Sequence, residues 1–347
     1  MSDPLLSVRD LTVRFRARAG TVTAVDRVSF DLAEGETLAV LGETGSGKSV
    51  TAQALMGLVP HPAGRVTGGQ IHYAGSDLLA RPRAQTRRLN GTELAMVFQD
   101  PLSSLNPVFR VGAQIGELFR RRQGASRAEA RRKAIELMDR VGIPAAARRV
   151  DDYPHQFSGG MRQRVMIAMA LALRPRLLIA DEPTTALDVT VQAQIMALLA
   201  ELKAEHRMAM ILISHDLGVV AGVADRVMIM YAGRVVETGG LREVYDTMGH
   251  PYTRGLMASI PDLDGPRERL VPIPGAPPDL MRLPSGCPFR PRCAFATDVC
   301  ATERPDLAPV PGPGAVDGGL PSPAGSHRAA CHHTKEVLAD VRPAVGS

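Results

Sequence analysis

The sequence has no apolar run long enough to cross a membrane. The longest, near 165–173, contains nine residues and is followed by Arg174 and Pro175, whereas a spanning helix needs about 20 predominantly apolar residues. The first four residues, Met1-Ser2-Asp3-Pro4, have neither the basic start nor the apolar segment of a secretory signal. We therefore expect the chain to stay in the cytoplasm and to act at a membrane only through a partner.

Strong charge and abundant cysteine are lacking as well. The net charge is only +5 over 347 residues, with small basic clusters at 120–122 and 131–133. A mild excess of this kind predicts a solvated basic face rather than a nucleic-acid-binding patch. The four cysteines all follow residue 286, in a segment after about Pro261 that is dense in proline and glycine. This change in composition predicts a separate, loop-rich C-terminal segment.

The most informative feature that is present is a glycine-rich loop matching G-x-x-x-x-G-K-[ST]. Its residues are Gly42, Glu43, Thr44, Gly45, Ser46, Gly47, Lys48 and Ser49. The apolar run before it predicts a buried strand, and the segment after it predicts a helix. This arrangement directs several backbone N–H groups at one anion. We expect a nucleotide here, with Lys48 on its β- and γ-phosphates and Ser49 on Mg²⁺.

The remaining segments up to about residue 240 alternate between strand and helix patterns. Predicted strands lie at 6–15, 22–30, 37–41, 177–180 and 210–213, predicted helices at 50–56, 111–122, 128–141 and 189–205, and loops with short strands over 60–95. Alternation of this kind predicts a parallel sheet with helices on its faces.

Two further patterns suit phosphate chemistry. Asp181 and Glu182 end an apolar strand, and an acid at the carboxyl end of a parallel strand faces the ligand crevice. We expect Asp181 to orient the Mg²⁺ shell and Glu182 to polarise the attacking water. Ser158, Gly159 and Gly160 open a predicted helix, where a serine N-cap and free N–H groups favour an anion.

The segment 157–164, Phe-Ser-Gly-Gly-Met-Arg-Gln-Arg, resembles the signature motif of ABC-type ATPases. Other motifs of that family occur in order: Gln99 matches the Q-loop, 186–188 the D-loop and His215 the switch histidine, while Phe15 resembles the aromatic residue that stacks on adenine. The resemblance covers about 5–250. It departs from the family pattern at Phe157, where leucine is usual, and at Met161, where glutamine is most frequent.

The resemblance implies an α/β P-loop NTPase with a RecA-like parallel sheet core, an antiparallel β subdomain and a helical subdomain at about 101–172. It implies an ABC ATPase domain over 1–257 and a C-terminal extension over 258–347. The implied catalytic residues are Glu182, His215 and Gln99. ATP would contact Phe15, the loop 42–49 and Val50, with Ser158, Gly159 and Gly160 of a second subunit in trans, and Mg²⁺ would contact Ser49, Gln99 and Asp181.

Within that family, several stretches resemble the ATP-binding subunits of oligopeptide and dipeptide importers, a group that includes nickel and glutathione uptake. They are 24–30, 97–107, 153–157 and 250–254, and 161–170 is similar to the D-type subunit. The resemblance implies an ATPase at the cytoplasmic face of the membrane that drives peptide uptake. Its implied partners are a sister ABC ATPase, two transmembrane permease subunits and, indirectly, an extracytoplasmic substrate-binding protein. A heterodimer is favoured, a homodimer stays open, and the transported substrate is undetermined.

The cysteines, Cys287, Cys293, Cys300 and Cys331, leave several states open. Cytosolic thiols stay reduced, so disulfides are not expected, and zinc sites usually have more closely spaced pairs. Four thiolates on a loop-rich segment suit a [4Fe–4S] cluster, and the surrounding pattern resembles the extension of the importer ATPases. A cluster, zinc and free thiols are the alternatives, and His332 and His333 are further candidate ligands.

A second functional hypothesis is a soluble ABC ATPase acting on nucleic acid or ribosomes. DNA-repair members of the family usually carry a long insertion between the phosphate loop and the signature, and translation factors usually carry two ATPase units. The interval from Lys48 to Phe157 is short and the chain has one unit. The sequence therefore favours transport, with no nucleic acid as partner.

Overall fold

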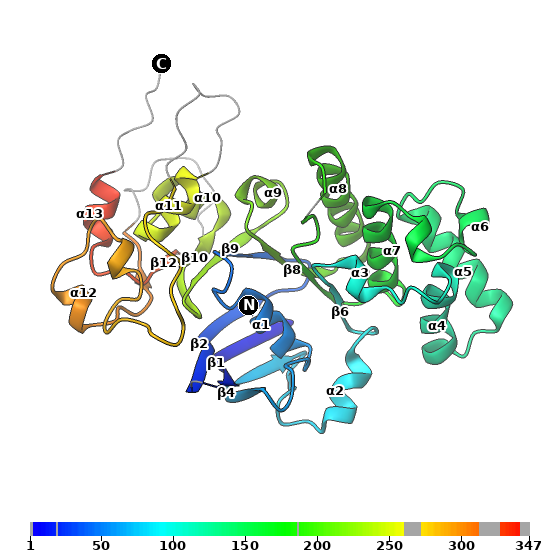
Figure 1. Cartoon of the computed structure of the whole chain (residues 1–347), viewed down its shortest axis with the longest axis horizontal. Helices are drawn as coiled ribbons and strands as arrows, with labels where there is room; N and C mark the ends of the chain where they lie inside the picture. The colour runs from blue at the N-terminus through cyan, green and yellow to red at the C-terminus, as the bar shows by residue number, and fades with distance from the viewer. Residues whose placement is uncertain (1–2, 19, 186, 260–271, 312–326, 341–347) are drawn as a thin grey trace, which may run out of the picture. The chain divides into compact units, whose positions relative to one another are not determined.

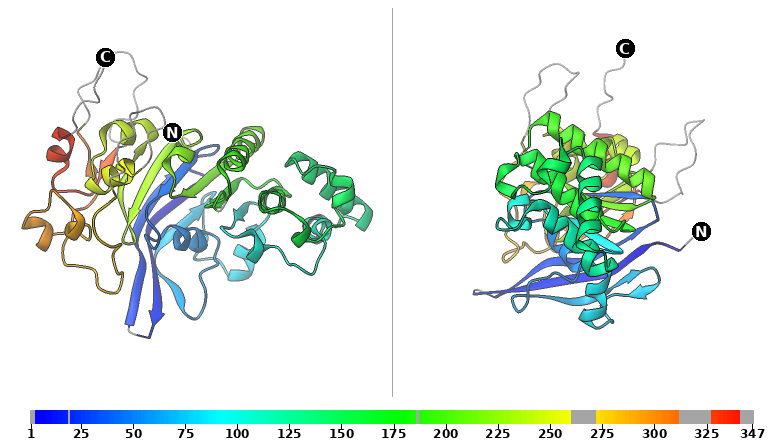
Figure 2. Two further views of the ribbon diagram at one scale, coloured as in Figure 1. Left: turned by 45° about the horizontal axis from the view of Figure 1, so that its top comes forward. Right: turned by 90° about the vertical axis from the view of Figure 1, so that its right-hand side faces the viewer.

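The computed structural model describes residues 3–18, 20–185, 187–259, 272–311 and 327–340 (Figures 1 and 2). The chain divides into two compact units. Unit 1 comprises Met1–Leu5, Leu32–Thr37 and Asp77–Ile213, and unit 2 comprises Leu6–Asp31, Leu38–Ser76 and Ser214–Ser347. The C-terminal extension thus shares a unit with the phosphate loop. The division at residue 257 that the resemblance implies stays a prediction.

Unit 2 contains two groups of strands. In the first, β1 (Leu6–Ala17) lies between β2 (Gly20–Leu32) and β4 (Gly64–Tyr73), and its pairing with β4 is antiparallel. In the second, β3 (Thr37–Leu41) pairs in parallel with β9 (Arg226–Tyr231), which pairs antiparallel with β10 (Arg234–Gly240). All five residues of β3 are buried, as its apolar sequence predicts for a strand covered on both faces.

Unit 2 also contains several helices and short strands. They are α1 (Lys48–Leu55), β5 (Ser76–Asp77), α9 (Leu217–Ala221), α10 (Leu241–Thr247), α11 (Pro251–Ala258), η2 (Arg290–Arg292), α12 (Val299–Thr302), β11 (Ala308–Pro309), β12 (Arg328–Ala329) and α13 (Thr334–Ala339). Strand β12 joins the second group of strands by pairing with β10. The extension therefore contributes a strand to the sheet that carries the phosphate loop.

Unit 1 has a parallel sheet of β6 (Leu94–Val97), β7 (Leu177–Asp181) and β8 (Ala209–Ser214). Its helices are α2 (Arg83–Leu89), α3 (Pro101–Ser104), α4 (Val111–Gln123), α5 (Arg127–Arg140), α6 (Ala146–Arg149), η1 (Pro154–Gln156), α7 (Gly159–Leu171) and α8 (Val189–His206). In the predicted helical region, α4 to α7 gather together (Figure 1). Helix α5 buries Ala130, Ala134 and Met138, a four-residue spacing that forms one apolar face.

Most predicted elements are present, and the largest departure lies within 60–95. Loops and short strands were expected there, but β4 runs for ten residues and α2 is a seven-residue helix. Glycine-rich sequence has weak strand preference. The strand forms because its backbone pairs with β1 over most of its length, a long-range contact that sequence spacing does not reveal.

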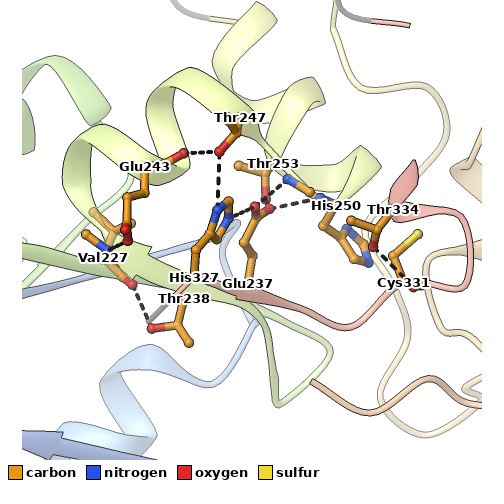
Figure 3. A network of polar contacts seen from close by, with 12 residues as sticks. Val227, Glu237, Thr238, Glu243, Thr247, His250, Thr253, His327, Cys331 and Thr334 are labelled. Atoms are coloured by element: carbon orange, nitrogen blue, oxygen red, sulfur yellow. Dashed lines mark hydrogen bonds and ion pairs between the residues drawn. The ribbon is translucent and has the colours of Figure 1, made fainter. Parts of the chain in front are cut away.

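A buried polar network attaches the extension to β10 (Figure 3). Its centre is Glu237, which is fully buried. The Glu237 carboxylate accepts hydrogen bonds from the backbone N–H groups of Gly249 and His250 and from the Thr253 hydroxyl, and it contacts Nε2 of His327 at 2.7 Å. Burial of a carboxylate is costly unless its oxygens are paired. The position of His327, and of the strand that follows it, is therefore fixed by Glu237.

Candidate functional site

The phosphate loop connects β3 to α1 with a backbone that only glycine adopts easily. Gly42 has φ +147° and Gly47, the N-cap of α1, has φ +104°. A Cβ atom at Gly42 would lie 2.3 Å from the Met230 carbonyl oxygen, and one at Gly47 would lie 2.5 Å from the Ala24 carbonyl oxygen. The glycines therefore serve two needs, the left-handed dihedral angles and close approach to neighbouring backbone.

The polar groups inside the loop fit an anionic ligand. The Lys48 side chain is buried, and its Nζ donates to the carbonyl oxygens of Gly42 and Glu43 at 2.7 and 3.0 Å. The Ser46 hydroxyl is buried and has no hydrogen-bond partner among the residues that the structure describes. The start of α1 adds backbone N–H groups that have no acceptor within the helix. An ammonium, a hydroxyl and a helix N-terminus at one loop suit a phosphate group.

Glu182 follows β7 in unit 1 and is held by two side chains. Its carboxylate oxygen Oε2 accepts hydrogen bonds from Gln99 Nε2 and Thr185 Oγ1, both at 2.9 Å. Its backbone is in the left-handed region with φ +47°, and its N–H donates to the Ile213 carbonyl oxygen at the end of β8. A left-handed glutamate is strained, and such strain persists where surrounding contacts fix the residue.

Gln99 and Glu182 are 83 positions apart in the chain, and the structure joins them directly. Gln99 follows β6, and β6 pairs in parallel with β7. Because the carboxyl ends of parallel strands meet at one edge, both side chains emerge there. Asp181, the last residue of β7, is buried at the same edge. Sequence reasoning missed Thr185, although its position three residues after Glu182 in a turn is a usable signal.

The predicted signature segment begins α7. Ser158 is the N-cap, and its hydroxyl accepts a hydrogen bond from the Met161 N–H at 3.3 Å. Ser158 and Gly159 are exposed, and Gly160 is half-buried. A Cβ at Gly160 would lie 2.8 Å from a methyl group of Val191 in α8. This helix N-terminus is thus presented to solvent on a backbone that packs closely against α8.

Two further predicted residues belong to unit 2, which also contains the phosphate loop. His215 is exposed and directly follows β8, and Phe15 is half-exposed on β1. The Phe15 ring lies against Gly64, where an added Cβ would approach it to 2.6 Å. Unit 2 therefore carries the phosphate loop, Phe15 and His215, while unit 1 carries Gln99, Asp181, Glu182 and the signature segment.

The four cysteines are free thiols in the extension, with Cys300 buried and the other three half-buried. Burial raises the pKa of Cys287 and Cys293, and that of Cys331 to about 12, so these thiols are neutral at pH 7. The described ranges contain no set of three or more His, Cys, Asp or Glu side chains arranged to hold a metal ion. The predicted iron–sulfur cluster is therefore not supported, and neither is zinc.

Across 3–259 and the described parts of the extension, no helix combines the length and the apolar character needed to cross a bilayer.

A phosphate loop between a buried strand and a helix, with two acids at the end of another parallel strand, defines a P-loop nucleotide-binding protein. Comparison with known proteins narrows this class. The ABC transporter family matches residues 25–185, and the C-terminal region of oligopeptide/dipeptide transporters matches residues 236–300.

Individual relatives agree with the family matches. The chain is similar to the oligopeptide transport ATP-binding protein OppD of Haemophilus influenzae, with 53% identity over 86% of this chain and 92% of the relative. It is similar to the dipeptide transport ATP-binding protein DppD of Escherichia coli, with 49% identity over 87% and 92%. A solved structure of the ATP-binding cassette MJ0796, a dimer with ADP and Pi, matches with a TM-score of 0.62 and 26% identity over 68% of this chain and 99% of that one.

The chain belongs to the ABC transporter ATPases, in the group of oligopeptide and dipeptide transporters. The fold is an ABC ATPase cassette of the P-loop type, as the resemblance implied. The alternative of a soluble ATPase acting on nucleic acid or ribosomes is not favoured, since the relatives are transport proteins by name.

Proposed function

We propose that this chain is the ATP-hydrolysing subunit of a peptide importer, and that it couples ATP turnover at a two-subunit interface to uptake across the cytoplasmic membrane. Its relatives OppD and DppD are named for oligopeptide and dipeptide transport. The observation that carries the catalytic part is the contact between Glu182 and Gln99. It places a carboxylate beside the amide of Gln99 in a chain that also has a phosphate loop.

Each residue of the proposed site has a task that its setting supports. Lys48 and the loop 42–49, with Val50, bind the phosphates, and Phe15 stacks on the base. Ser49, Gln99 and Asp181 hold Mg²⁺, which would neutralise charge that develops on the transferred phosphoryl group. Glu182 accepts a proton from the attacking water, and His215 donates to the γ-phosphate. Positioning and charge stabilisation supply most of the catalysis in this class of reaction.

Pairing with a second ATPase subunit completes the proposed site. Ser158, Gly159 and Gly160 present the N-terminus of α7 to solvent, where it can meet the nucleotide of a partner. Val189, the first residue of α8, is apolar and 82% exposed, and we propose that the partner covers it. Nucleotide binding then favours the paired state, and hydrolysis releases it. Because the segment that begins at Met161 resembles the D-type subunit of the importer family, the proposed partner is a sister ATPase.

A membrane permease is the proposed partner on unit 1. Three large apolar side chains within ten positions of Gln99 in the chain are exposed: Phe98 at 38%, Val108 at 71% and Phe109 at 56%. Exposed large apolar residues in one segment of a chain suit a contact with another protein. Docking of one of the two permease subunits here would place the chain at the cytoplasmic face of the membrane and transmit movement of the Gln99 loop. The substrate-binding protein would act from the other side of the membrane.

The substitution Glu182→Gln tests the catalytic proposal. We expect ATP turnover of the complex with its partner subunits to fall by about 100-fold or more, since a general base contributes at least that much. Binding of MgATP should be retained, because the amide preserves shape and removes negative charge. Phosphate release and nucleotide binding measure the two effects.

The matched control is Glu136→Gln on α5, an exposed glutamate that pairs with Arg132. It should leave turnover unchanged. Turnover by the Glu182→Gln complex at the wild-type rate would contradict the assignment.

A further inference from the structure

The C-terminal extension contacts the phosphate loop through a charge pair. Arg292, at the end of η2, donates from Nη1 to Oε2 of Glu43 at 2.7 Å and from Nη2 to Oε1 at 2.9 Å. Glu43 is the second residue of the phosphate loop, and 249 positions separate the two residues. Two parallel N–H···O bonds of this kind fix orientation as well as charge.

Arg292 is built into its place. Its side chain is only 5% exposed, and its Nε donates to the carbonyl oxygen of Pro274 at 2.8 Å. The guanidinium lies 5.9 Å from the ring centres of both Tyr231 and Phe289. The Glu43 pair raises the pKa of Arg292 above its ordinary value, so the guanidinium stays charged. A buried arginine that bonds both carboxylate oxygens differs from a surface ion pair, which contributes little.

The other polar groups of Glu43 are also held. Its backbone N–H donates to the hydroxyl of Tyr252 at 2.7 Å, and its carbonyl oxygen accepts from Lys48 Nζ at 3.0 Å. Tyr252 is fully buried and packs against Tyr231 and Phe289. One loop residue is therefore fixed from three directions, and Arg292 supplies the side-chain contact.

The charge of Glu43 explains why this contact bears on nucleotide binding. A carboxylate in a loop that binds a polyanion opposes that binding, because like charges repel strongly in a partly buried site. Arg292 pairs both carboxylate oxygens and so cancels the charge. Without it, the carboxylate would keep its charge and gain freedom to turn toward the phosphates.

We infer that Arg292 is a positioning residue for nucleotide binding, which neutralises Glu43 and fixes the phosphate loop in its binding conformation. The inference rests on the proposed binding of ATP at this loop. Through Arg292, the extension is then part of the nucleotide site.

The test is a set of variants of the full-length chain titrated with a fluorescent ATP analogue and Mg²⁺. We expect Arg292→Met to weaken binding by about tenfold or more, because it leaves a partly buried carboxylate unpaired. Adding Glu43→Gln to that variant should restore binding to within about threefold of Glu43→Gln alone, since the charge needing neutralisation is then absent. Arg304→Met is the control: Arg304 also links the extension to the N-terminal strands, through Asp26, and this variant should bind as the wild type does.

The outcomes separate the possible explanations. Equal weakness of Arg292→Met and the double variant would overturn the inference, because it would show a structural role unrelated to Glu43. Binding by Arg292→Met at the wild-type level would also overturn it. If Arg292→Met does not fold, Arg292→Lys decides: it keeps the charge, loses the paired bonds and should bind between threefold and tenfold more weakly, whereas unchanged binding would contradict us. Failure of the wild type to bind MgATP would instead reject the proposed function.

Discussion

At the scale of the residue, the structure holds Glu182 more tightly than the adjacent sequence indicates. It combines a left-handed backbone with two side-chain donors, Gln99 and Thr185. The two donors direct one carboxylate oxygen, so the other oxygen has a defined orientation. A carboxylate that is held in this way needs no reorganisation before it accepts a proton, which is how preorganised groups lower a barrier.

Thr185→Val tests the contribution of the second donor. We expect the turnover number to fall about fivefold with little change in KM for ATP, the effect of one lost hydrogen bond to the general base. Steady-state kinetics of the assembled complex measures both values. Thr92→Val is the matched control, because the Thr92 hydroxyl contacts only the backbone oxygens of Arg88 and Leu89 among the contacts described. A drop of equal size in both variants would contradict the role of Thr185.

At the scale of the element, the turn between β3 and α1 depends on close backbone approach. Gly47 precedes Lys48 and fits against the Ala24 carbonyl oxygen in β2. Gly124, which ends α4, has φ +68° but open space around it. Substitutions at these two glycines therefore distinguish the energetic cost of a left-handed backbone from the cost of a steric collision.

Gly47→Ala should lower the free energy of unfolding by about 2–5 kcal/mol, since a collision with backbone adds to the left-handed strain. Gly124→Ala should lower it by only about 1–2 kcal/mol, the cost of the dihedral angles. Urea denaturation of the two variants gives the comparison. Equal losses would show that the contact with β2 relaxes at little cost.

At the scale of the whole molecule, each compact unit joins segments that are distant in sequence. In unit 2 the extension is held by Glu237 with His327 and by Glu43 with Arg292. Both contacts bury a carboxylate against a cationic or titratable side chain, and removal of one partner from such a pair is strongly destabilising. The stability of unit 2 should therefore depend on pH through its buried groups.

His250 determines the direction in which the stability of unit 2 changes with pH. It is fully buried beside Glu237, which His327 also contacts, and burial lowers the pKa of His250 to about 4. An unfolded histidine has a pKa of about 6.5, so the unfolded state binds the extra proton between these values. The contribution of His250 is present above pH 6.5 and is lost as the pH falls toward 4, by about 3 kcal/mol in total.

Denaturant unfolding at several pH values between 7 and 4.5 measures this slope. His250→Asn should flatten this slope. In the wild type, Nδ1 of His250, the N-cap of α11, accepts a hydrogen bond from the Tyr252 N–H, and asparagine keeps an acceptor at that position. The same slope in the variant would assign the pH dependence to other groups.

The sequence by itself determined the phosphate loop, the acids at the end of β7, the signature segment and most helices and strands. These features are local: a loop of fixed spacing, an apolar run or an amphipathic helix is specified by adjacent residues. The tertiary structure decided the contacts between distant residues. Thr185 on Glu182, Arg292 on Glu43 and His327 on Glu237 depend on which strands pair and how loops return, and β4 owes its length to β1. Two side chains that are distant in sequence form a pair only when folding brings them close together, and their spacing along the chain does not specify that contact.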